Sequence, residues 1–213
     1  MELTVLGATG GIGQEIVRQA LAAGHRVTAV VRDPARLTVT GEGLQVFTAG
    51  LGDPRALGPA VAGRDAVLSG LGARSVKDAR AGIAANLTRP VLKALDAEGT
   101  RRFLAVSAGP LAPEPKNQTF VHRRLLTPLV STLLRPVYTD LAQMEAEIRL
   151  SATDWTLVRP PRLLDRPVTG TYRMARNENL RGGGTIGRAD VAHAMLAMVD
   201  DPTTVKQGVS VAY

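Results

Sequence analysis

Four glycines stand within seven residues near the start of the chain, in the stretch VLGATGGIGQEIV at residues 5–17. Glycine in regular structure costs roughly 0.5–1 kcal/mol relative to alanine, so this cluster indicates that something passes close to the backbone. Gly7, Gly10 and Gly13 have the spacing G-x-x-G-x-x-G, directly after an apolar run and at the start of an amphipathic one. Such glycines allow a tight turn and let a diphosphate rest on a helix N-terminus. The pattern therefore predicts a site for a nicotinamide dinucleotide.

The residues after the second predicted strand favour NADP(H) over NAD(H). Arg32 follows Gly13 by nineteen residues, where the ribose of the adenosine is usually recognised. A guanidinium suits a 2′-phosphate because it combines charge with bidentate geometry, and Arg36 is a candidate second contact. Asp33 leaves an alternative open, since a carboxylate facing the ribose would favour the 2′-hydroxyl of NAD(H).

Asp53 follows the third predicted strand and precedes Pro54. An aspartate before a proline is typical of a helix N-cap with proline at the first helical position. The same edge of the sheet would also let Asp53 contact the adenine amine, and the two roles are compatible.

Short apolar runs alternate with longer amphipathic stretches along the chain, which is typical of strands and helices in turn. Strands are predicted at residues 2–6, 26–31, 44–48, 65–70, 102–107, 154–159 and 207–212. Helices are predicted at residues 11–23, 54–62, 79–98, 138–151 and 189–200. This order indicates a Rossmann-like, doubly wound parallel sheet with helices on both faces. A chain of 213 residues suits one such domain, spanning residues 1–213.

The alternation breaks in two places. Residues 108–137 are rich in proline yet too apolar for a plain linker, and residues 160–187 combine prolines with a run of three glycines. We expect both segments to be irregular excursions on the substrate side of the sheet.

The composition argues against several classes of function. The net charge is +7, but the arginines are scattered and aromatic residues make up only 3% of the chain, so no nucleic-acid partner is expected. The chain has no cysteine for a thiolate nucleophile or thiolate metal site, and we expect no metal. No apolar run reaches the roughly 18–20 residues of a membrane span. We expect a cytoplasmic protein without a membrane partner, a monomer or small homo-oligomer that acts on a small-molecule substrate.

Several stretches, in order over nearly the whole chain, resemble the atypical short-chain dehydrogenase/reductases. The similarity is to the NAD(P)H-binding subgroup that includes biliverdin reductase B, a flavin reductase, and the NmrA-like proteins. The stretches that carry it are LGATGGIGQEIVRQAL, VRDPARL, AVLSGLGAR, FLAVSAGP, DWTLVRPPRL and RADVAHAML. These motifs are specific for the cofactor fold and much less so for the substrate.

The resemblance implies where the parts of the cofactor would lie. The diphosphate is expected along Gly7, Thr9, Gly10, Gly11, Ile12 and Gly13. Arg32 is expected at the 2′-phosphate, with Asp53 at the adenine and with Leu71 and Gly72 on the ribose side of the adenosine. The nicotinamide is expected near Ser107 and Ala108, with Pro160 and Pro161 on its other flank.

The chain departs from the usual short-chain dehydrogenases at the proton donor. These enzymes use Tyr-x-x-x-Lys, in which the lysine lowers the tyrosine pKa. Here Tyr138 is followed four residues later by Ala142, and Tyr138 is better explained as packing or as a pocket wall. Ser107 is the remaining polar candidate for a catalytic role, able to hydrogen-bond a carbonyl or ring nitrogen of the substrate.

Three further charged residues have two interpretations each. Asp190 fits the last predicted helix as a cap or as a first-turn carboxylate. Arg159 and Arg162 flank the paired prolines, where either one could contact an acidic substrate or be solvated or paired.

These observations favour an NADPH-dependent reductase that transfers hydride to a flat conjugated acceptor, such as a flavin, a quinone or a tetrapyrrole-like ring. The alternative is an NmrA-like sensor that binds NADP(H) and reports its redox state without turnover. An epimerase or dehydratase that uses the cofactor without net oxidation is a third hypothesis.

Overall fold

A central eight-stranded sheet organises the chain, and the computed structural model describes residues 1–73, 75–113 and 128–213 of it, with side chains of the last range from residue 134. The strand order is β3-β2-β1-β4-β5-β6-β10-β8. All neighbouring strands are parallel except β8 and β10. The strands span β1 Glu2–Leu6, β2 Arg26–Val31, β3 Leu44–Thr48, β4 Ala66–Ser69, β5 Arg102–Val106, β6 Asp154–Arg159, β8 Arg173–Arg176 and β10 Gln207–Ala212. This order is that of a Rossmann-like fold, as the sequence predicts.

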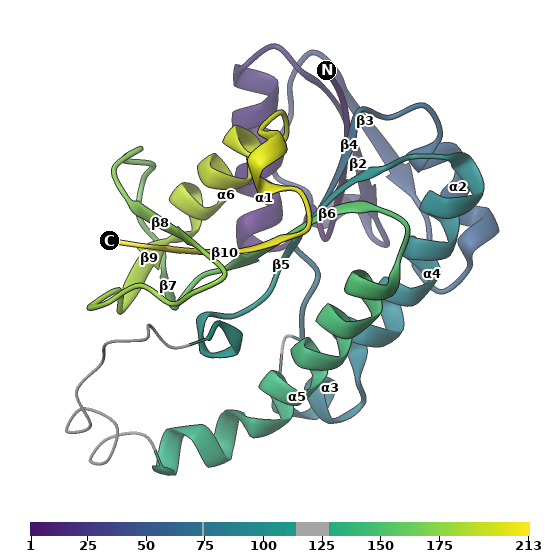
Figure 1. Cartoon of the computed structure of the whole chain (residues 1–213). Coiled ribbons are helices and arrows are strands. Elements are labelled where there is room, and N and C mark those ends of the chain that lie inside the picture. Colours follow the sequence, from purple (N-terminus) through teal and green to yellow (C-terminus); the bar gives the residue numbers. More distant parts are fainter. Residues whose placement is uncertain (74, 114–127) are drawn as a thin grey trace.

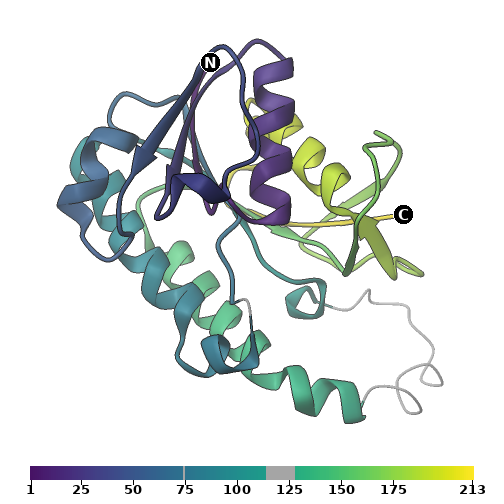
Figure 2. The ribbon, with the colours of Figure 1, turned by 180° about the vertical axis from the view of Figure 1, so that it is seen from behind.

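Helices cover both faces of the sheet (Figures 1 and 2). On one face α1 (Gly11–Ala22) packs against α6 (Arg188–Ala197), and on the other α4 (Ile83–Glu98) lies between α2 (Pro54–Val61) and α5 (Pro128–Leu150). Alternate residues of a strand point to opposite faces. Leu104 of β5 therefore joins the core under α1 and α6, whereas its neighbour Phe103 joins the core under α4 and α5.

The two predicted excursions contain more regular structure than expected. The helix α5 begins at Pro128, so the expectation of an irregular segment is wrong for residues 128–137, while residues 114–127 lie outside the described part of the chain. Proline is tolerated at the first helical position because its missing N–H needs no partner there. The second segment contains β8 and a separate two-stranded parallel sheet of β7 (Arg162–Leu164) and β9 (Thr185–Gly187).

The predicted helix at residues 79–98 is divided in two, which corrects its start. Gly82 takes a left-handed conformation with φ of +66° and separates α3 (Val76–Arg80) from α4. The buried carboxylate of Asp140 accepts hydrogen bonds from the backbone N–H groups of Ala84 (2.9 Å) and Ala85 (3.0 Å). These two bonds satisfy N–H groups in the first turn of α4 that would otherwise lack partners.

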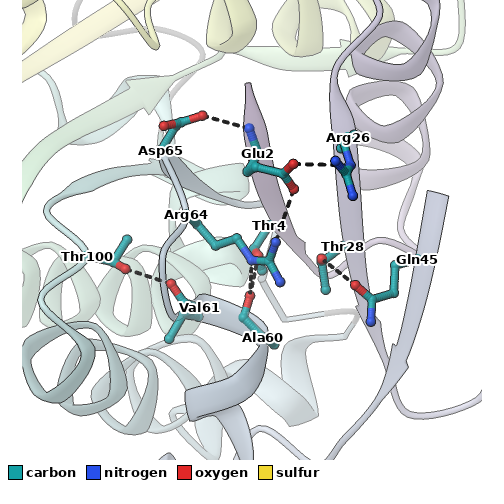
Figure 3. A network of polar contacts seen from close by, with 10 residues as sticks. All are labelled: Glu2, Thr4, Arg26, Thr28, Gln45, Ala60, Val61, Arg64, Asp65 and Thr100. Atoms are coloured by element: carbon teal, nitrogen blue, oxygen red, sulfur yellow. Dashed lines mark hydrogen bonds and ion pairs between the residues drawn. The ribbon is translucent and has the colours of Figure 1, made fainter. Parts of the chain in front are cut away.

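A polar network at the amino ends of the strands connects the sheet to α2 and the loop after it (Figure 3). Glu2, the first residue of β1, pairs with Arg26 (3.1 Å) and with Arg64 (3.2 Å). The Thr4 hydroxyl donates to the carbonyl oxygen of Ala60. The network lies at the end of β1 opposite Gly7. It therefore stabilises the contact between the sheet and α2 without occupying the edge where the glycine loop lies.

Arg102 of β5 connects the sheet to the chain that follows α6. Its half-buried guanidinium donates to the carbonyl oxygens of Asp154, Met198 and Val199 and to the hydroxyls of Thr156 and Thr204. Burial lowers the pKa of Arg102, although nearby carboxylates, Asp154 first, oppose this shift.

We expect Arg102→Met to lower the free energy of unfolding by about 2–3 kcal/mol, because the five acceptors lose a charged donor and three are backbone carbonyls. The neighbouring Arg101 provides a matched control, since its only ion pair within the described residues is with Asp154 at 3.8 Å, and the two side chains are 59% and 40% exposed. Arg101→Met should cost less than about 1 kcal/mol. Urea denaturation of both variants checks the difference, and equal losses would contradict it.

Candidate dinucleotide-binding site

The glycine loop forms a tight turn between β1 and α1, as the spacing predicts. Gly7 has a φ of +72°, and its carbonyl oxygen accepts a hydrogen bond from the N–H of Gly10 at 2.9 Å. A Cβ at Gly13 would lie 2.1 Å from that same oxygen, and a Cβ at Gly7 would lie 3.0 Å from the carbonyl carbon of Gly70. The turn therefore leaves no room for side chains at Gly7 and Gly13.

A cavity of about 480 Å³ lies beside this turn, where the order of the strands reverses between β1 and β4. Open parallel sheets bind ligands at this point. Seven of the predicted residues line it, namely Gly7, Thr9, Gly10, Gly11, Arg32, Leu71 and Gly72. The sequence analysis missed two charged residues in the lining, Asp78 and Arg188.

Other predicted contacts lie outside the lining of this cavity. Ile12 and Gly13 are buried in the first turn of α1, beneath the loop. Arg36 is exposed. Ser107, Ala108, Pro160 and Pro161 follow β5 and β6 and do not line the cavity, so their contacts with the nicotinamide remain predictions.

The two acidic residues near the adenosine side both act as caps. The Asp33 carboxylate accepts a hydrogen bond from the N–H of Ala35 (3.1 Å) and caps a short 3₁₀ turn. The Asp53 carboxylate accepts one from the N–H of Arg55 (2.9 Å) and caps α2, which confirms its predicted structural role. Neither side chain lines the cavity, whereas Arg32 does.

Ser107 is one member of a buried polar cluster at the carboxyl ends of β5 and β6. Its side chain points to the α5 face, and its hydroxyl donates to Glu145 Oε1 at 2.6 Å. The guanidinium of Arg159 donates to both oxygens of the same carboxylate, at 2.9 Å and 2.7 Å. Arg149 adds a bond of 2.5 Å. Arg159 is only 4% exposed, so the paired interpretation of this arginine is confirmed.

The pKa of Glu145 is held below its usual value. Burial alone would raise this pKa, but the hydrogen bonds from Arg159 and Ser107 and the charges of Arg159 and Arg149 lower it further than burial raises it. Glu145 is therefore ionised at neutral pH, and the hydroxyl proton of Ser107 is directed to it. Towards a ligand, the Ser107 oxygen is left as an acceptor.

Asp190 lies in the first turn of α6, as predicted, and it is fully buried. Its carboxylate accepts hydrogen bonds from the Tyr213 hydroxyl (2.7 Å) and from the backbone N–H groups of Thr169 (2.8 Å) and Gly170 (2.9 Å). Although burial opposes this, these hydrogen bonds lower the pKa of Asp190. Asp190 thus anchors the loop before β8 and the last strand to α6.

The described ranges contain no helix that is long and apolar enough to span a membrane. Within the same ranges, no three His, Asp or Glu side chains lie close enough together to hold a metal ion.

The fold and the site define a Rossmann-like, dinucleotide-binding protein. Residues 7–202 match the model of the NAD(P)H-binding family, and the chain belongs to this family. The resemblance seen in the sequence is thereby confirmed at the level of the NAD(P)H-binding family.

Two curated relatives match most of the chain. One, an uncharacterised sugar epimerase from Bacillus subtilis, is 26% identical over 209 residues, which cover 96% of this chain and 90% of that protein. The other, a (4-alkanoyl-5-oxo-2,5-dihydrofuran-3-yl)methyl phosphate reductase from Streptomyces griseus, is 28% identical over 202 residues. This match covers 93% of this chain but only 58% of the reductase.

A solved structure from Streptococcus pneumoniae, provisionally assigned as an NADH-flavin reductase, has a TM-score of 0.79. The match covers 100% of this chain and 99% of that one at 24% identity. At this identity the likeness supports the fold alone.

Proposed function

We propose that the protein is an NADPH-dependent reductase whose acceptor is a flat conjugated molecule such as a flavin, a quinone or a tetrapyrrole-like ring. The observation that carries the choice of NADPH is the contrast at the end of β2. Arg32 lines the cavity, whereas Asp33 caps a turn and is engaged with the N–H of Ala35. A guanidinium that lines the cavity suits a 2′-phosphate, whereas the Asp33 carboxylate does not line the cavity in which the ribose would lie.

The glycine turn fits the cofactor because its tight shape, which brings the start of α1 to the cavity, depends on glycine: a Cβ at Gly7 or Gly13 would meet backbone atoms of Gly70 or Gly7. A bound NADPH would supply hydride to the acceptor. The N-terminus of α1 begins with Gly10 as its cap, has no acidic residue in its first turn and has no capping side chain. Its backbone N–H groups are therefore available to a diphosphate.

The class of acceptor follows from the missing proton donor. No Tyr-x-x-x-Lys motif is present, and the proton of Ser107 is directed to Glu145. An electron-poor ring can accept hydride and take its proton from solvent, whereas an isolated carbonyl benefits from a positioned acid. Ser107 would serve as a hydrogen-bond acceptor that orients a ligand N–H group.

We expect Arg32→Ala to weaken NADPH binding by about 10- to 100-fold, because charge-assisted hydrogen bonds contribute roughly 1.5–3 kcal/mol and each 1.4 kcal/mol is tenfold. NADH binding should change little, since NADH lacks the 2′-phosphate. Fluorescence titration with each nucleotide measures both constants. Arg101→Ala is the control because the Arg101 side chain is 59% exposed and lies outside the cavity lining. An equal effect of Arg32→Ala on both nucleotides would contradict the assignment.

Turnover is tested by following the absorbance of NADPH with FMN and a panel of quinones. Acceptor-dependent oxidation that falls in Arg32→Ala supports the reductase. Nucleotide binding without oxidation of NADPH favours the redox sensor. A sensor needs no proton relay, so the lack of a Tyr-x-x-x-Lys motif agrees equally well with this function. Conversion of a substrate without net oxidation favours an epimerase.

A further inference from the structure

Arg188 brings a positive charge to the start of α1 from a distant part of the chain. It is the first residue of α6, and α6 packs beside α1 (Figures 1 and 2). Its side chain lines the same cavity as Gly10, Gly11 and Arg32. Arg188 also borders an adjoining cavity that Asp165 lines, so its side chain borders both cavities.

The fourth glycine of the loop explains how the side chain reaches this place. Gly11 does not belong to the G-x-x-G-x-x-G spacing and has no left-handed φ. A Cβ at Gly11 would nevertheless lie 2.7 Å from Cδ and 3.1 Å from Nε of Arg188. The Arg188 side chain therefore passes directly over the first turn of α1, and glycine leaves the space for it.

The present partner of the guanidinium is weakly held. Arg188 Nη1 lies 2.5 Å from Asp165 Oδ1, but the side chain of Asp165 is 88% exposed and that of Arg188 is 31% exposed. An ion pair this exposed to solvent contributes little to the free energy of folding, and its partners are readily exchanged. A diphosphate at the start of α1 carries two negative charges and offers bidentate geometry to a guanidinium.

We propose that Arg188 binds the diphosphate of the dinucleotide, and that Asp165 competes for its guanidinium and holds it beside the cavity when no nucleotide is present. The proposal rests on dinucleotide binding and not on turnover. It gives Arg188 and Arg32 different targets, since Arg32 follows β2 on the adenosine side and Arg188 crosses the helix start that receives the diphosphate.

The test measures binding of ADP-ribose, which has the diphosphate but no 2′-phosphate, and of 2′-AMP, which has the 2′-phosphate but no diphosphate. Titration calorimetry should show Arg188→Ala binding ADP-ribose about tenfold more weakly, with 2′-AMP unchanged. Arg32→Ala should show the opposite selectivity. The control for net charge is Arg101→Ala, because the Arg101 side chain is 59% exposed and does not line the cavity.

Asp165→Asn provides the second arm, because it removes the competitor and leaves Arg188 in place. ADP-ribose should bind about 2- to 5-fold more tightly, in line with the strength of an exposed ion pair. In the double variant with Arg188→Ala this gain should disappear. Arg188→Lys, which keeps the charge without the planar fork, should bind with intermediate affinity and guards against a folding defect of the alanine variant.

The proposal is overturned if Arg188→Ala binds ADP-ribose no more weakly than Arg101→Ala does, or if Asp165→Asn still tightens binding without Arg188. A wild-type protein that binds ADP-ribose as described but oxidises no NADPH would defeat the reductase and leave this assignment standing. A wild-type protein that binds neither ADP-ribose nor NADPH would defeat both.

Discussion

Gly13→Ala is expected to abolish measurable NADPH binding and to lower the free energy of unfolding by about 3 kcal/mol, at the upper end for overpacking. The new Cβ would lie 2.1 Å from the carbonyl oxygen of Gly7, 2.8 Å from its carbonyl carbon and 2.9 Å from Cα of Ala8. All three are backbone atoms, so no side-chain rotation relieves the contact. The turn would have to open, and with it the hydrogen bond from Gly10 to Gly7.

Urea denaturation and fluorescence titration with NADPH measure the two losses. Gly52→Ala is a suitable control, because a Cβ there meets no atom within 4 Å and its φ is not left-handed. It should change either quantity by no more than a few tenths of a kcal/mol. Wild-type affinity in Gly13→Ala would mean that the glycine turn does not hold the dinucleotide.

The parts of the site that the sequence predicts are those that depend on residues close together in the chain. The turn from Gly7 to Gly13 depends on neighbouring residues, and the spacing of its glycines is sufficient to predict it. The strands β1, β2, β4, β5, β6 and β10 are short apolar runs that are buried along most of their length, so their positions could be predicted to within a residue or two. The short strands β7, β8 and β9 lie in a segment that was expected to be irregular, and they were not predicted. The cap at Asp53 also needs only the proline that follows it.

Arg188 could not be predicted as part of the site because its position depends on the packing of α6 against α1. Asp165, its partner, precedes it by 23 residues in a segment without a clear periodicity. The one local signal was Gly11, a glycine that the fingerprint spacing does not require. The need for glycine at this position is explained only by the Arg188 side chain, which passes over it in the folded structure.

The buried cluster around Glu145 had a signal that the sequence analysis did not use. Leu141, Met144 and Ile148 define the apolar face of α5, and a glutamate beside Met144 on that face requires a partner. Arg159 shares a strand face with Trp155 and Leu157, both of which belong to the core under α5. Strand alternation therefore points Arg159 towards the same helix.

Glu145→Ala should be the most destabilising single change among those considered, lowering the free energy of unfolding by about 3–5 kcal/mol. The buried Arg159 side chain, which is 4% exposed, would lose the carboxylate that it binds, and the Ser107 hydroxyl would lose its acceptor. Arg159 also has little room to move, since a Cβ at the neighbouring Gly208 would lie 2.5 Å from its Nη1 atom. Replacing both partners, as Glu145→Leu with Arg159→Met, should recover much of the loss because no charge is then buried alone.

Glu147 on the same helix is a matched control for this prediction. It pairs with Arg89 at 2.9 Å, but the two side chains are 33% and 40% exposed. Glu147→Gln should therefore cost less than about 1 kcal/mol in urea denaturation. If Glu145→Ala costs no more than Glu147→Gln, the cluster around Ser107 does not stabilise the fold as its burial indicates.

The pH dependence of the free energy of unfolding tests the lowered pKa of Glu145 independently. Burial opposes ionisation of Glu145, but the bonds and charges from Arg159, Ser107 and Arg149 hold its folded-state pKa below the unfolded value of about 4.3. The contribution is therefore fully present well above that unfolded value and is lost as the pH falls towards the lower folded value. Wild-type stability should fall more steeply than that of Glu145→Gln between about pH 5 and pH 3. Parallel curves for the two proteins would show that Glu145 keeps its unfolded-state pKa, and the net stabilisation of its carboxylate by Arg159, Ser107 and Arg149 would have to be given up.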